Sequence, residues 1–273
     1  MDDSREPARE RPQATSPDAA STMDTERRKR TRVEVLLVLG VSLGYDAIYA
    51  LIDLIGKLTA HKALNAQTTT LNASHAPGRP WLDLLFQIAQ ILFGVVPAFL
   101  ALHFLKLSGP ADPVGFRSRR LKFDIGWGVL LAAVIGIPGL GLYLGSRAIG
   151  LDTTIVPEAL PTVWWTVPVL LLSAVENALL EEVVVVGYLV QRLRELSWSV
   201  PMAVAASALL RGSYHLYQGF GGFIGNIAMG IVFAAFFVRF KRVTPLVIAH
   251  ALLDTFAFVG YALLHNRLGF LGA

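Results

Sequence analysis

The chain has 273 residues, of which 54% are hydrophobic and only 16% are charged. Soluble domains carry about 25% charged residues, so this composition argues against a soluble globular protein. No cysteine is present, which excludes disulfides, thiolate nucleophiles and cysteine-ligated zinc. The formal net charge is +4, and most Lys and Arg residues lie beside apolar segments. Nucleic-acid binding is therefore a poor explanation of the basicity.

Residues 1–32 hold Pro, Ser, Thr, Asp and Arg and almost no large apolar side chain. Such a segment cannot bury enough surface to fold, so it is predicted to be a disordered cytoplasmic tail. A signal peptide is not expected, because the apolar run that follows is too long for one and has no small-residue cleavage site after it.

The rest of the chain consists of long apolar stretches separated by short charged loops. A helix needs about 20 mainly apolar residues to cross the hydrocarbon core of a bilayer. Seven stretches are predicted to do so: residues 33–55, 82–105, 125–144, 163–190, 200–218, 222–240 and 243–264. The predicted fold is therefore all-α, a polytopic membrane helix bundle with about seven transmembrane helices.

Basic residues gather in alternate loops of this bundle. They are Arg27, Arg28, Lys29, Arg30 and Arg32; Lys106, Arg117, Arg119, Arg120 and Lys122; Arg192 and Arg194; and Arg239, Lys241 and Arg242. The positive-inside rule then places the N-terminus in the cytoplasm and the C-terminus outside. The excess of Arg over Lys favours a bacterial plasma membrane.

Ionisable residues within a membrane segment are costly and are functional candidates. In the fourth segment, Glu181 and Glu182 are adjacent and point about 100° apart on a helix. At 3.6 residues per turn, one face carries Ser173, Asn177, Glu181, Tyr188 and Arg192. Two buried carboxylates would repel each other unless a cation or metal lies nearby. Solvation in the headgroup region is a weak alternative, because eight mostly apolar residues follow Glu182.

The fifth and seventh segments carry further polar stripes. Ser207, Arg211, His215 and Gln218 share one helix face, and His250 and Asp254 are four residues apart. A single membrane histidine is more often a packing hydrogen-bonder than a catalyst. Together, however, the three stripes offer a general base, imidazole donors and a possible metal site in a water-filled cavity. Asp46 and Asp53, on the first segment, are interpreted as structural hydrogen-bonding residues.

Three short motifs follow one another on separate predicted helices: Glu181-Glu182 followed by Gly187, Arg211 followed by His215, and His250 followed by Asp254. Their order and spacing resemble those of the CPBP family, also called the Abi family of CAAX-type intramembrane endopeptidases. The resemblance covers about residues 169–264. It divides the chain into N-terminal transmembrane helices, residues 33–168, and a protease-like core, residues 169–265.

The resemblance implies a peptidase that acts on a membrane-embedded or lipidated peptide or protein. In that case Glu181 activates a water molecule with help from His215, whereas His250 and Asp254 polarise the scissile carbonyl and stabilise its oxyanion. Glu182 completes the implied catalytic set. The family has been described both as metal-dependent and as metal-free, so Glu181, His215 and His250 could also hold a divalent metal such as zinc. We expect the cavity to open on the cytoplasmic side.

Two positions depart from the family pattern. The motif arginine is Val186 here, and a phenylalanine of the second motif is Arg211. Because an unpaired arginine in a membrane helix is costly, Arg211 is hypothesised to reach Glu182 on the neighbouring helix. It could instead face water, or bind Glu181 or Asp254. A transporter, a proton relay or a catalytically inactive scaffold remains the alternative function.

The expected helix boundaries leave one mismatch in depth. At 1.5 Å per residue, Glu181 lies roughly 13 Å from the cytoplasmic end of the fourth segment. His250 lies roughly 10 Å from that end of the seventh segment, and His215 roughly 22 Å from the start of the fifth. Three side chains of one site should lie at similar depth. Either the fifth segment begins deeper, or it is tilted, or the boundaries are wrong by about one turn.

Overall fold

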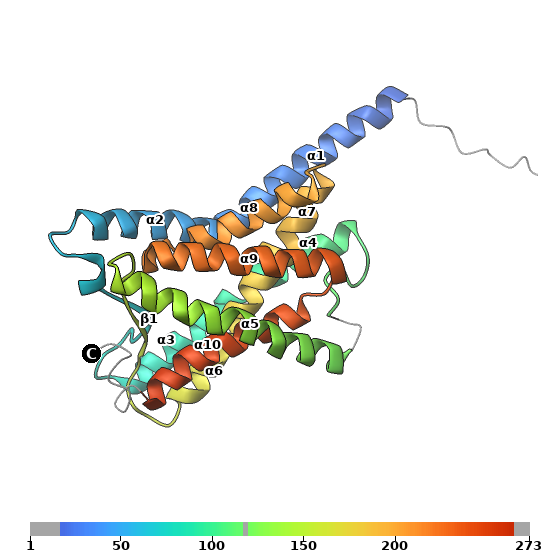
Figure 1. Ribbon diagram of the computed structural model, residues 1–273. Helices are drawn as coiled ribbons and strands as arrows, with labels where there is room; N and C mark the ends of the chain where they lie inside the picture. The colour runs from blue at the N-terminus through green and yellow to red at the C-terminus, as the bar shows by residue number, and fades with distance from the viewer. Residues whose placement is uncertain (1–16, 117–119, 265–273) are drawn as a thin grey trace, which may run out of the picture.

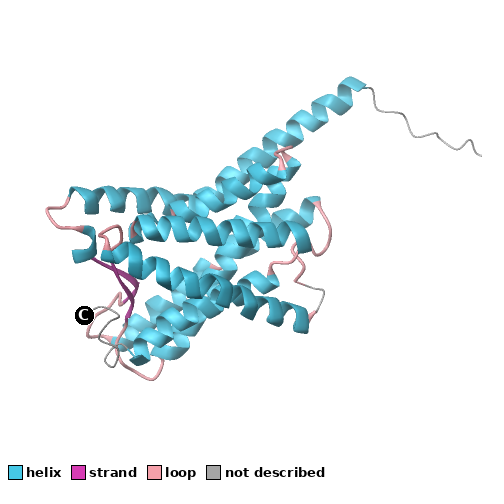
Figure 2. Ribbon diagram, in the orientation of Figure 1, coloured by secondary structure: helices cyan, strands magenta, loops and turns pink. Residues whose placement is uncertain are grey.

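The computed structural model describes residues 17–116 and 120–264. Figures 1 and 2 show a bundle of helices with one small sheet at the end where the chain leaves α2. The helices are α1 (Pro17–Gly40), α2 (Leu43–Thr59), α3 (Pro80–Gly94), α4 (Val96–Ser108), α5 (Leu121–Ala148), α6 (Thr166–Glu181), α7 (Leu189–Glu195), α8 (Val200–Ser213), α9 (Phe220–Phe240) and α10 (Thr244–Leu264). The strands are β1 (Thr68–Ala73) and β2 (Thr154–Ala159), and the short helices are η1 (Leu64–Ala66), η2 (Glu182–Tyr188) and η3 (Leu216–Gln218). The predicted all-α membrane bundle is confirmed.

The outer faces of the helices are apolar, as expected for contact with lipid. Large hydrophobic side chains such as Phe93, Ile137 and Phe256 are exposed, and without surrounding lipid such an outside would be unfavourable in water. The packed interior centres on the valines of η2, which are fully buried between neighbouring helices. The chain is an integral membrane protein.

Fewer helices meet the requirements for crossing a bilayer than the seven predicted. Among the described residues, four are long and apolar enough: Pro80–Ser108, Leu121–Ala148, Phe220–Phe240 and Thr244–Leu263. A fifth span arises if Met23–Gly40 and Leu43–Thr59, bent by 51°, are counted together. The prediction treated residues 163–190 and 200–218 as uninterrupted helices. In the structure the first is interrupted by η2, and α8 ends at Ser213.

The first 32 residues also differ from the prediction of a disordered tail. Helix α1 begins at Pro17 and runs through this segment to Gly40, while residues 1–16 lie outside the described part of the chain. The Arg28 side chain donates to Asp24, one turn away, at 2.9 Å. Once the apolar end of α1 is helical, extending the helix by one more residue costs little free energy, because the unfavourable nucleation step has already occurred. Low hydrophobicity alone therefore did not rule out a helix.

The two strands form a parallel two-stranded sheet, with Thr68 opposite Thr154 and Asn72 opposite Glu158. Both strands are short and begin with threonine, a β-branched residue that favours extended backbone. Strand β1 follows the end of α2 and β2 follows the end of α5. The sheet thus marks the end of the bundle opposite the basic segment that precedes Leu121.

The loop before β2 is tied to the start of α9. The Oδ1 atom of Asp152 accepts a hydrogen bond from the backbone of Gly221 at 2.8 Å, and the Thr153 amide donates to the Gln218 carbonyl at 2.9 Å. Gly219 adopts a φ of 123°, which strongly favours glycine. These contacts fix η3 beside the sheet and so set one wall of the functional cavity described below.

We expect the orientation given by the basic loops to hold. Reporter fusions after Arg120, Arg194 and Lys241 should read cytoplasmic, because these positions adjoin the clusters of Lys and Arg. A fusion after Ala273, which lies outside the described residues, should read external. Alkaline phosphatase and fluorescent-protein fusions measure the two sides independently. A cytoplasmic Ala273 would require an even number of crossings and would contradict the orientation.

Candidate active site

A wide helical turn positions the two glutamates. Helix α6 ends at Glu181, and η2 continues from Glu182 to Tyr188 as a π-helix. Four successive β-branched residues, 183–186, follow Glu182, and such residues are weak formers of α-helix. The Ser207 hydroxyl donates to the Val185 carbonyl at 2.8 Å, which satisfies a backbone group within the widened turn. Single π-turns inside α-helices occur often at functional sites.

The π-turn sends the two carboxylates to different surroundings. Glu181 lines a cavity of about 670 Å³, and its Oε2 atom accepts a hydrogen bond from the Tyr214 hydroxyl at 2.7 Å. Glu182 is 0% exposed and lies behind the cavity wall. The two adjacent glutamates can therefore have different functions: Glu181 can meet water or substrate, whereas Glu182 contacts only protein.

Glu182 lies against the one arginine of α8. The Arg211 Nη2 atom is 2.5 Å from Glu182 Oε1, and both side chains are 0% exposed. This is the interhelical pair hypothesised from the sequence. Arg211 Nη1 also lies 3.6 Å from Glu181 Oε2, so one guanidinium faces both carboxylates. The mutual repulsion expected of adjacent glutamates is offset by this shared cation.

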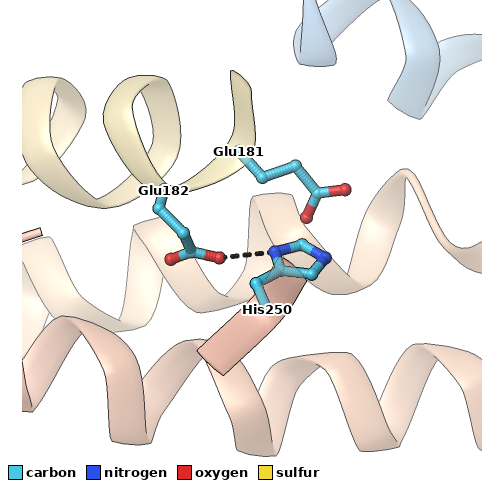
Figure 3. Close-up of side chains that lie close together, drawn as sticks. All are labelled: Glu181, Glu182 and His250. Atoms are coloured by element: carbon cyan, nitrogen blue, oxygen red, sulfur yellow. Dashed lines mark hydrogen bonds and ion pairs between the residues drawn. The ribbon is translucent and has the colours of Figure 1, made fainter. Parts of the chain in front are cut away.

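His250, on α10, completes the buried contacts of Glu182. Its Nδ1 atom lies 2.8 Å from Glu182 Oε1, as Figure 3 shows. A carboxylate paired with arginine can only accept, so Nδ1 of His250 carries the proton and donates it in this bond. In Figure 3 the Glu181 carboxylate lies on the other side of the same imidazole. Glu182 thereby holds the ring through Nδ1, and the nearest described carboxylate to Nε2 lies beyond hydrogen-bonding distance.

Asp254 and Asn177 flank the free edge of that imidazole. The His250 Nε2 atom lies 3.7 Å from Asp254 Oδ1, and the Asn177 side chain donates to Asp254 Oδ2 at 3.3 Å. All three side chains line the cavity. Asp254 thus faces His250 as an acceptor.

His215 enters the cavity from the turn after α8. Its Nδ1 atom lies 3.0 Å from the Arg211 carbonyl oxygen, which can only accept, so Nδ1 carries a proton. When the ring is neutral, Nε2 is then an acceptor. The structure thus brings Glu181, His215, His250 and Asp254 to one cavity, and it places Glu182 outside that cavity.

The observed helix boundaries remove the depth mismatch between Glu181 and His215. Helix α7 continues to Glu195 rather than to residue 190, so Glu181 lies 14 residues from the end of this helical segment, and His215 lies 15 residues from the start of α8. Both distances are then roughly 21–22 Å at α-helical rise. Helix α10 begins at Thr244, six residues before His250, and Arg242 before it is buried against Asp124 near the start of α5, with Nη2 2.6 Å from Oδ2.

The cavity does not extend to the side that was expected. Residues Thr68–Asn72 of β1 line it, together with Lys57 at the end of α2 and Gln218 of η3. The sheet lies opposite the basic segment before α5, so the cavity extends away from the loops assigned to the cytoplasm. This direction does not follow from the helix pattern alone, because the sheet was not predicted.

The polar face predicted for the fourth segment lines the cavity from Ser173 to Glu181, but not beyond Glu181. Tyr188 and Arg192 do not line the cavity. Their side chains instead bond to Glu34 of α1, at 2.9 Å and 2.8 Å. One extra residue in a turn shifts the phase of a helix by roughly 100°, so the π-turn moves both residues to another face.

Three further residues of the cavity were not assigned a role in the site from the sequence. Tyr214 bonds Glu181, and Glu176 lies one turn before the motif on α6. Asp46 was interpreted as a structural group but lines the cavity from α2. The signal for Tyr214 was its place immediately before His215. For Asp46, the seven-residue spacing to Asp53 already indicated a shared helix face.

A divalent metal at this site fits the residues poorly. Glu181, Glu182 and His250 each bring one possible ligand atom to within 4.8 Å of the others, whereas His215 is not part of any such group among the described residues. His250 Nδ1 is already bonded to Glu182, and Arg211 contacts both carboxylates. Zinc sites need their ligand atoms free and convergent. The residues therefore fit an ion-paired site better than a metal centre.

Residues 163–256 match the family model described as Rce1-like, type II CAAX prenyl endopeptidase. This segment, about a third of the chain, is similar to that family. The match confirms the resemblance inferred from the three motifs, and it includes every residue of the candidate site that lies on α6 to α10. Comparison with curated proteins and with solved structures gives no match. Within residues 163–256, Val186 and Arg211 remain the departures from the motif pattern.

Proposed function

We propose that the protein is an intramembrane endopeptidase in which Glu181 is the general base. The observation that supports this most strongly is the separation of the two glutamates: Glu181 faces a water-accessible cavity with two histidines, while Glu182 is buried in an ion pair. The substrate is a peptide or protein that lies in the bilayer or is anchored there by a lipid.

Glu181 takes a proton from a water molecule, and the hydroxide attacks the scissile carbonyl carbon. The Tyr214 hydroxyl, which donates to Glu181 at 2.7 Å, holds the carboxylate in place. His215, with Nδ1 protonated, offers Nε2 as an acceptor that orients the same water. The proton then passes from Glu181 to the leaving amine as the tetrahedral intermediate collapses, so the base is restored.

His250 supplies the stabilisation of the oxyanion. In its protonated form the ring donates Nδ1–H to Glu182 and has Nε2–H available for the developing negative charge. A fixed donor at this point acts mainly in the transition state, where the charge appears. Asp254 and Asn177 hold the ring edge, so the donor does not need to reorganise during the reaction.

The proposal is tested with purified protein in liposomes and an internally quenched peptide that ends in a prenylated Cys-Ala-Ala-X motif. Cleavage should separate the fluorophore from the quencher and should yield fragments of defined mass. The same peptide without the prenyl group tests whether the lipid is required. No cleavage of either peptide by folded protein would contradict the proposed activity and would favour an inactive scaffold.

We further propose that this activity needs no metal, because Arg211 supplies the positive charge beside the carboxylates. The cleavage rate should therefore remain unchanged after incubation with EDTA or phenanthroline. Mass spectrometry of the intact protein before and after the treatment checks whether a metal was removed. Loss of activity that zinc restores would contradict the proposal and would favour the metal-dependent interpretation.

A further inference from the structure

The cavity carries a marked excess of negative charge. Its lining carboxylates are Asp46, Asp53, Glu176, Glu181 and Asp254. Lys57 is the one Lys or Arg among the lining residues within the described chain. Such an excess in a low-dielectric surrounding attracts cations and repels anions. The question is which of these carboxylates still lack a partner.

Three of the carboxylates already have one. Lys57 Nζ lies 2.6 Å from Asp53 and also donates to Thr69 Oγ1 at 2.8 Å and to the Tyr217 carbonyl at 2.6 Å. All three ammonium protons are thereby engaged. Glu181 faces Tyr214 and Arg211, and Asp254 faces Asn177 and His250, as described above. Lys57 therefore cannot neutralise a further group.

Glu176 has no such partner. It is 7% exposed and lines the cavity, yet its side chain has no hydrogen bond or ion pair to any described residue. A Cβ atom at Gly94, at the break between α3 and α4, would collide with the Glu176 carboxylate. The backbone thus leaves room for this group at a place where an unpaired carboxylate is costly.

Asp46 contributes a second unpartnered carboxylate from another element. It belongs to α2, and no hydrogen bond or ion pair joins its side-chain carboxylate to a described residue. It shares its helix face with Ala50 and Lys57, which also line the cavity. Two carboxylates from α2 and α6 therefore remain free in the cavity that holds Glu181.

A bare metal ion does not suit this pair. Among the described residues, the acidic and histidine groups whose ligand atoms converge within 4.8 Å are Glu181, Glu182 and His250, and neither Asp46 nor Glu176 is included. A metal needs several oxygen ligands at roughly 2–2.6 Å. A long side chain with several N–H donors can bridge carboxylates that are further apart.

We propose that Asp46 and Glu176 form a subsite for a positively charged side chain, Lys or Arg, of the peptide substrate. This deepens the proposed function and rests on it, because the subsite lies in the same cavity as Glu181. The basic side chain neutralises the buried Glu176 when the peptide is bound. The protease should therefore prefer peptides that carry a basic residue within reach of the scissile bond.

The test measures binding separately from cleavage. Fluorescent prenylated peptides are titrated into the Glu181→Gln protein in detergent, and anisotropy gives the affinity. In each peptide one position carries either lysine or the uncharged norleucine, and the position is moved along the peptide. At one position lysine should strengthen binding by about tenfold or more, as expected for a charge-assisted contact.

Glu176→Gln and Asp46→Asn, each in the Glu181→Gln background, should remove that preference without weakening the binding of the norleucine peptides. Glu26→Gln, an exposed position on α1, is the matched control and should leave the preference intact. Since Asp46 is exposed, its variant should fold even if the variant at Glu176 does not.

Equal binding of lysine and norleucine peptides at every position would overturn the subsite, as would no binding of any lysine peptide. A preference that survives both substitutions would also overturn it. If the lysine preference is present but wild-type protein cleaves nothing, the proposed activity fails and the subsite stands. If wild-type protein cleaves the peptides but lysine strengthens binding at no position, the subsite fails and the proposed activity stands.

Discussion

Glu181→Gln should reduce the rate of peptide cleavage by roughly a thousandfold, within the range that general-base catalysis contributes. The substitution keeps the shape of the side chain and leaves an oxygen that can still accept the hydrogen bond from Tyr214. It removes only the group that takes a proton from water. Initial rates on the quenched peptide measure the effect, and a saturating peptide concentration separates a loss of turnover from a loss of binding.

The control for this substitution is Glu26→Gln, which removes a carboxylate of the same kind far from the cavity and should leave the rate unchanged. The unfolding temperature of the Glu181→Gln protein should stay close to that of the wild type, because Glu181 is not the main partner of Arg211. Near wild-type cleavage by the Glu181→Gln protein would mean that another group activates the water.

Arg211→Leu should lower the free energy of unfolding by about 3–5 kcal/mol, the usual cost of breaking a buried ion pair from one side. Leucine fills part of the space but leaves Glu182 charged and 0% exposed, with His250 as its remaining side-chain partner among the described residues. Equilibrium unfolding in mixed micelles measures the loss. Arg194→Leu, which removes an exposed arginine, is the matched control and should change stability by less than about 0.5 kcal/mol.

A double-mutant cycle tests whether the effect comes from the pair itself. Glu182→Leu alone leaves Arg211 buried without its closest partner and should cost about as much as Arg211→Leu. The double variant replaces both charges with apolar groups, which is often nearly neutral, so it should be more stable than either single variant. Additive losses in the double variant would show that the two residues are not coupled.

The sequence predicted those parts of the molecule that depend on one helix at a time. The apolar lengths predicted the membrane bundle, and the spacing of His250 and Asp254 placed both on one face of α10. The pairing of Arg211 with Glu182 followed from the high cost of an unpaired charge in a membrane.

Features that depend on irregular backbone were missed. Nothing in a 3.6-residue periodicity indicates a π-turn, so Tyr188 was assigned to the wrong face. The six-residue strand β1 lies within a polar loop and pairs with a strand more than eighty residues away, and such pairing leaves little local signal. The missing sheet in turn concealed the direction of the cavity and the role of Asp46.

The π-turn of η2 also has a consequence for how this segment can change in evolution. Before it, α6 presents Glu181 to the cavity; after it, Tyr188 and Arg192 hold α1 through Glu34. The extra residue of the π-turn rotates the following helix about its axis, so the side chains that line the cavity and those that contact α1 lie on different faces of one continuous helical segment. Substitutions that adapt the contact with α1 can accumulate without turning Glu181 away from the cavity.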